Sequence, residues 1–108
     1  MSDDIETLLQ QDRDLVRAKI NSETAKIPWR ELQRFFAQGK VMQVTDQLDL
    51  VDVAFAVQQD DIGQVRQWTE TEQLSLVSDD QAREWFESDS TLWAVVIKPW
   101  VLVQPPKD

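Results

Sequence analysis

The chain has no cysteine, no histidine and no tyrosine among its 108 residues. Without cysteine it can form no disulfide, and without cysteine or histidine it lacks the ligands of the common structural zinc sites. The same absences exclude catalysis by Ser-His-Asp and Cys-His arrangements. Only two glycines are present, and no glycine-rich phosphate loop is found. An enzyme of this composition would depend on Asp, Glu, Arg and Lys, because carboxylates can do acid–base work without histidine.

Long apolar runs are lacking as well. The longest one, residues 92–97, has six residues, whereas a membrane-spanning helix needs about 20. The acidic opening MSDDIETLLQQ contains no apolar core and does not have the pattern of a signal peptide. We therefore expect a cytoplasmic protein.

Basic residues are few compared with acidic ones. The chain has 11 Lys and Arg against 20 Asp and Glu, which gives a net charge of −9. Such a negative field repels nucleic-acid backbones and anionic membranes, so we expect neither as a partner. It would attract a basic protein, although charge of this kind also simply keeps a small protein soluble.

Apolar residues recur at helical spacing near the beginning of the chain. The face formed by Leu15, Val16 and Ile20 predicts a helix over residues 12–25. Residues 1–11 are either an N-terminal tail or an extension of that helix. A second helix is predicted over residues 29–38, with Pro28 suited to its first position because proline lacks the N–H that would be unpaired there.

Three further helices are predicted downstream. Asp46 is expected to cap a mostly buried helix over residues 48–59. Its polar stripe would be Asp49, Asp52, Ala56 and Gln59. Another helix begins at Asp60 or Asp61, with Ile62, Val65 and Trp68 facing inward. Ser78 and Gln81 form a capping box for the last one.

Short segments rich in β-branched residues predict strands at residues 41–45 and 74–77 and in the C-terminal stretch LWAVVIKPWVLVQ. Pro99 marks an edge position, a bulge or a turn within that stretch. We therefore predict an α+β fold with four or five helices on a sheet of three or four strands, mixed or antiparallel. The C-terminal strand would be its central or main strand, and residues 12–108 would form one domain.

Five residues are candidates for binding, and they are Trp29, Arg30, Asp49, Asp52 and Trp100. Together with Trp93, the two tryptophans could line a pocket in which Arg30 or Arg34 holds an anion. Core packing is the competing interpretation, because each tryptophan can bury about 150–250 Å².

The two aspartates would lie on one face of a helix, three residues apart. They could bind a hard cation such as Mg²⁺, but their spacing matches no metal loop, which favours the interpretation of a solvated helix edge with caps. We predict no metal, no cofactor and no catalytic residue.

Three segments, ETAKIPWRELQRFFAQGKV, LDLVDVAFAVQQDD and WAVVIKPWVLVQ, together resemble a family of small bacterial proteins known as domain of unknown function 2288. The resemblance covers residues 12–104. It implies a bacterial, cytoplasmic, stand-alone domain, and it transfers no activity and no functional residue.

The sequence thus favours a small non-enzymatic interaction or adaptor domain that binds an unknown protein partner or a second copy of itself. Residues 93–104 could form an exposed sheet edge through which two copies pair, or could pack beneath the chain's own helices. The alternative function is a small-molecule or hard-metal binding protein, or a hydrolase that uses carboxylates alone.

Overall fold

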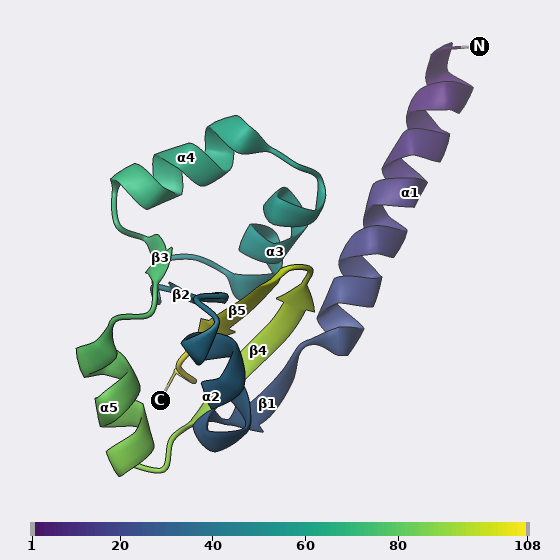
Figure 1. Ribbon diagram of the computed structural model, residues 1–108. Helices are drawn as coiled ribbons and strands as arrows, with labels where there is room; N and C mark the ends of the chain where they lie inside the picture. The colour runs from purple at the N-terminus through teal and green to yellow at the C-terminus, as the bar shows by residue number, and fades with distance from the viewer. Residues whose placement is uncertain (1, 108) are drawn as a thin grey trace.

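The computed structural model describes residues 2–107, which form five helices and a five-stranded mixed sheet (Figure 1). The predicted α+β class is confirmed. Along the chain the elements are α1 (Ser2–Glu23), β1 (Ala25–Pro28), α2 (Trp29–Ala37), β2 (Val41–Val44), α3 (Leu50–Gln58), α4 (Ile62–Glu70), β3 (Leu74–Leu76), α5 (Asp79–Glu87), β4 (Thr91–Ile97) and β5 (Trp100–Gln104).

The sheet is built around the C-terminal hairpin. Its strands lie in the order β1-β4-β5-β2-β3, so β5 is the central strand, as predicted. β5 runs parallel to β2, and the other neighbouring pairs are antiparallel. Lys98 and Pro99, joined by a cis peptide bond, form the turn between β4 and β5. Residues 93–104 therefore belong to two inner strands rather than to a sheet edge, and helices cover them except at Trp93 and Val96, which stay 37% and 52% exposed.

The structure has one strand more than the three or four predicted, and the strand that the sequence did not predict is β1. It pairs antiparallel with β4 at the edge of the sheet, where Pro28 lies opposite Thr91. The sequence predicted Pro28 at the first position of the helix. In the structure it is instead the extended residue just before α2, with φ −60° and ψ 138°. A proline is tolerated there because an edge strand needs no N–H on its outer side. The N–H of Trp29 then donates to the carbonyl of Ser90 over 2.8 Å.

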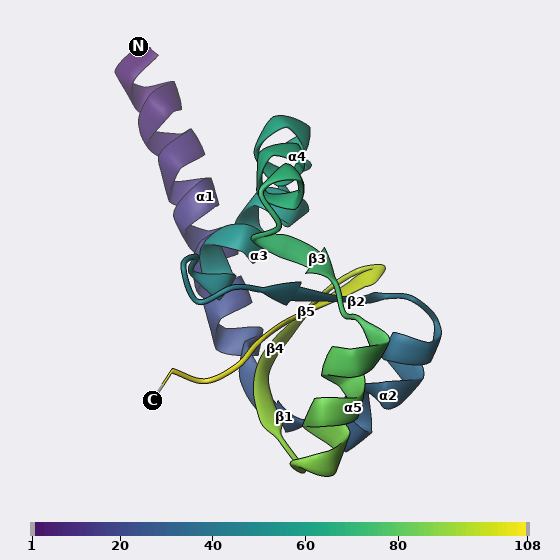
Figure 2. The ribbon, with the colours of Figure 1, turned by 90° about the vertical axis from the view of Figure 1, so that its left-hand side faces the viewer.

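Helices cover both faces of the sheet (Figures 1 and 2). On one face lie α2 and α5, where the ring of Trp29 packs against those of Phe36 and Trp85 at centroid distances of 5.7 and 5.1 Å. On the other lie α1, α3 and α4, which pack over Val95 and Leu102 of the central strands. Because β5 is covered on both sides, its residues 101–104 are all buried, and the sequence there does not alternate.

One buried polar side chain ties the central strand to a loop. The side-chain amide of Gln104 donates to the backbone carbonyls of Thr45 and Leu48, each over 2.8 Å. These carbonyls belong to the turn between β2 and α3. Gln104 thereby fixes the entry into α3.

The start of α3 differs from the prediction. Asp46 lies in a turn closed by the N–H of Leu48 and the carbonyl of Thr45. The cap is Asp49, whose carboxylate accepts from the backbone N–H groups of Val51 and Asp52 at 2.8 and 3.2 Å. Ala56, expected on the polar stripe, is buried, because α3 packs against α1, α4 and the sheet together.

Asp61, one of the two predicted caps, begins α4, and Ser78 begins α5 as predicted, but the side chain of Gln81 donates to Glu84 and does not close the predicted capping box. Asp61 accepts from the N–H of Gln64, and Ser78 accepts from the N–H of Gln81. The inward-facing pattern of α4 holds only in part. Val65 and Trp68 pack against the core, whereas Ile62, at the first turn, is 60% exposed.

Candidate functional site

The first helix extends beyond the rest of the molecule. α1 begins at Ser2, so the described part of residues 1–11 is helical. Its C-terminal half is attached through Val16 and the buried Ile20, and through an ion pair between Arg17 and Asp52. Its N-terminal half projects past α3 and α4 (Figures 1 and 2). The radius of gyration is consequently 15.3 Å, against about 13 Å for a compact domain of this length.

Four large apolar side chains of α1 remain in solvent, three of them on the projecting half. We refer to Ile5, Leu8, Leu9 and Leu15 as the α1 apolar face. Their side chains are 61%, 64%, 53% and 71% exposed, respectively. Spacings of three, four and seven residues place them on one broad side of the helix. Single exposed leucines are ordinary, but several on one helical face mark an interaction site.

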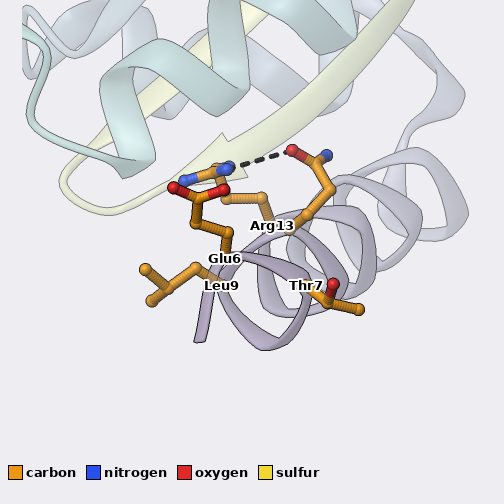
Figure 3. A pocket seen from close by; sticks show the side chains of 5 residues that line it. Glu6, Thr7, Leu9 and Arg13 are labelled. Atoms are coloured by element: carbon orange, nitrogen blue, oxygen red, sulfur yellow. Dashed lines mark hydrogen bonds between the residues drawn. The ribbon is translucent and has the colours of Figure 1, made fainter. Parts of the chain in front are cut away.

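Two opposite charges, Glu6 and Arg13, lie near this face and are seven residues apart, about two turns of the helix. In Figure 3, Glu6 and Arg13 extend from one side of α1, next to Leu9 and away from Thr7. The Arg13 guanidinium donates to the side-chain oxygen of Gln10 over 3.0 Å. The hollow beside these residues measures about 680 Å³, but all its lining residues come from α1. One helix cannot enclose a ligand, so this space is an open flank of the helix.

A smaller and more apolar pocket lies beneath α4. Its volume is about 250 Å³. The lining residues are Met42, Val57, Asp60, Asp61, Ile62, Val65, Leu74 and Trp100. Two carboxylates thus adjoin an otherwise apolar wall. Of the five candidate binding residues, Trp100 alone is among the lining residues.

The structure does not bring the predicted tryptophans together. Trp29 is 1% exposed in the core on the α2 and α5 face, whereas Trp100 packs with the cluster on the opposite face. Arg30 pairs with Asp89 at 3.0 Å and lies over the ring of Phe86 at 4.5 Å. Its guanidinium therefore already has a carboxylate partner.

The two predicted aspartates also have structural partners. Asp49 caps α3, and Asp52 pairs with Arg17 of α1. In the part of the chain that the structure describes, no group of three or more His, Cys, Asp or Glu side chains is placed to hold a metal ion. No described helix is long and apolar enough to cross a membrane.

The comparisons with known proteins identify a family and a similar fold, and they assign no functional site. Residues 15–105 match the family described as "Protein of unknown function (DUF2288)". The chain belongs to this family. A solution NMR structure of PA1075 from Pseudomonas aeruginosa is similar, with a TM-score of 0.76 and 48% sequence identity over 84% of each chain. No curated protein matches. The family match begins at Leu15, so most of the α1 apolar face lies outside it.

Sequence reasoning missed the α1 apolar face, although its signal is present. Ile5, Leu8 and Leu9 have the i, i+3, i+4 spacing of a helical face, and Leu15 lies seven residues after Leu8. The acidic residues around them made the segment look like a tail. Their exposure is known only once the position of the body is known.

Proposed function

We propose that this chain is a non-enzymatic protein-interaction domain whose contact surface is the α1 apolar face. The exposure of four large apolar side chains on a projecting helix carries the proposal. Helices in proteins gain most of their stability by packing an apolar face rather than from helix propensity. Among the described residues, Ile5, Leu8 and Leu9 on the outer half of α1 are not packed, so a partner that covers them stabilises both the helix and the complex.

The chemistry available at the surface agrees with this function. Arg30, Asp49 and Asp52 are engaged in a cap and in ion pairs within the chain. We also infer a bacterial, cytoplasmic protein; its bacterial origin is supported by 48% identity to a protein of Pseudomonas aeruginosa. An adaptor needs only its surface and a stable scaffold.

The test is affinity purification of the full chain from its native host, followed by mass spectrometry. Leu8→Glu places a charge in the α1 apolar face. Gln10→Glu adds the same charge two residues away, about 200° around the helix. We expect the wild type and Gln10→Glu to retain the same stoichiometric partner, or a second copy of the chain, and Leu8→Glu to lose it. Identical recoveries for all three proteins would contradict the proposal.

The pocket beneath α4 favours a second candidate function, the binding of a small ligand. Its volume of about 250 Å³ is below the range of about 300–1,000 Å³ typical of ligand pockets. The occupant would therefore be a small apolar group, and Asp60 and Asp61 would favour a positive charge on it. Titration with butylammonium, followed by the NMR signal of the Trp100 indole, tests this. An unchanged signal at millimolar concentration would exclude it.

A further inference from the structure

We infer that the partner of the α1 apolar face is a second copy of this chain, with the two α1 helices packed antiparallel. This inference rests on the proposed function and names its partner. It is drawn from the arrangement of apolar and charged residues along α1, whose N-terminal half projects past α3 and α4.

Charge is spread unevenly along α1. Asp4 and Glu6 near its N-terminal end have no basic neighbour, whereas towards the body Arg13, Arg17 and Lys19 balance Asp12, Asp14 and Glu23. In a parallel pair the acidic ends of both copies would lie together and repel each other. In an antiparallel pair the acidic end of each helix lies beside the part of the other in which basic residues balance the acidic ones, and Glu6 can meet Arg13. Charge complementarity therefore selects the antiparallel orientation.

The centres of the apolar and charged patterns coincide. The α1 apolar face runs from residue 5 to residue 15, so its midpoint is at residue 10. Glu6 and Arg13 extend from the same side of the helix (Figure 3) and are centred between residues 9 and 10. The two midpoints differ by about 1 Å along the axis, because the rise is about 1.5 Å per residue.

A two-fold axis through this point relates the two copies and makes their contact self-complementary. It sets Ile5 of each copy opposite Leu15 of the other. It also brings Glu6 of each copy next to Arg13 of the other, so that two symmetric ion pairs can form. One register therefore satisfies both the apolar and the charged residues.

Asp12 limits the strength of this contact. It lies within the apolar face, one turn from Leu8 and Leu15, so pairing removes water from its carboxylate. The overlap is also short, about three helical turns. We therefore expect a reversible dimer with a dissociation constant in the micromolar range rather than an obligate one.

Sedimentation equilibrium of four full-length proteins tests the inference. They are the wild type, Glu6→Arg, Arg13→Glu and the double exchange Glu6→Arg/Arg13→Glu. Each single variant places like charges at both symmetric contacts, and we expect it to weaken the dimer about tenfold or more. The double exchange restores both pairs, so its dissociation constant should return to within about threefold of the wild type. Both positions are exposed, and circular dichroism should show unchanged folding.

Three results would overturn the inference: a wild type that stays monomeric up to about 1 mM, single variants that dimerise as well as the wild type, or a double exchange as weak as the single variants. The proposed function fails separately. A monomeric wild type from which Leu8→Glu still removes a stoichiometric partner refutes the second copy but keeps the interaction domain. Failure of both experiments refutes both.

Discussion

Replacing Gln104 with methionine should destabilise the fold through two lost hydrogen bonds. Gln104 is 7% exposed, and its amide donates to the carbonyls of Thr45 and Leu48 at 2.8 Å each. Methionine has similar length and fills the same space but donates nothing. Each lost bond is worth about 1 kcal/mol, and a carbonyl left without a donor adds about 1 kcal/mol or more where water does not reach it. We expect a loss of about 2–4 kcal/mol.

That loss is a large share of the total, because domains of this size are stable by about 5–15 kcal/mol. At about 4–8 °C per kcal/mol, the midpoint of thermal unfolding should fall by ~8–32 °C. Urea unfolding followed by circular dichroism measures the free energy directly, and the slope with urea should stay unchanged.

Gln43 provides a matched control in the neighbouring strand β2. Its side-chain oxygen is buried and has no hydrogen-bond partner in the structure. Gln43→Met therefore removes a polar atom without breaking a bond through that atom, and we expect a change within about 0.5 kcal/mol or a small gain. If Gln104→Met and Gln43→Met had equal stabilities, the assigned role of Gln104 would be refuted.

Two further predictions concern the helices. Asp49→Ala removes the cap of α3 and should lower the free energy of unfolding by about 1 kcal/mol. Asp46→Ala should change it by less than about 0.5 kcal/mol. Urea unfolding measures both, and equal losses would contradict the assignment of the cap. Asp12→Leu should tighten the dimer at least about tenfold in sedimentation equilibrium, because it removes the carboxylate from the paired face. Asp14→Leu changes the net charge equally on another side of α1 and should leave the dissociation constant within about threefold, so equal tightening by both would indicate unspecific stickiness.

The core of the fold could be predicted from the sequence because its signals are local and strong. Residues 101–103 are a β-branched and leucine run bounded by Pro99 and Pro105, which identifies a strand buried on both faces. Ser78 is predicted as a cap from its spacing to Gln81, and Asp61 is one of two predicted caps because Asp60 and Asp61 both precede the apolar pattern of α4. Strand order could not be predicted in this way, since the parallel pairing of β2 with β5 joins segments about 60 residues apart.

The errors arose where two interpretations shared one residue type. Pro28 fits both the start of a helix and the end of an edge strand. β1 has only four residues, which is too few to show a clear strand pattern in the sequence. Asp46 and Asp49 are both good caps, and the choice of Asp49 depends on the turn that Gln104 holds in place. The sequence around Asp46 and Asp49 does not indicate the contact with Gln104, which lies more than 50 residues further along the chain.

The candidate site was the least predictable part, because exposure is a property of the whole fold. Trp29 and Trp100 looked alike in sequence, yet one fills the core and the other borders a pocket on the opposite face of the sheet. Ile5 and Leu8 are ordinary helical residues until the structure shows that nothing within the described chain covers them.

Amide hydrogen exchange of the wild type at two protein concentrations, about 10 μM and about 1 mM, tests the central claim most directly. The account predicts that the amides of Val101 and Val103 exchange slowly at both concentrations, because β5 is the core of the sheet. The amides of residues 5–15 should exchange quickly at the lower concentration and become protected at the higher one. Exchange in α1 that does not depend on concentration would contradict the claim that its exposed apolar face is a contact surface for a second copy.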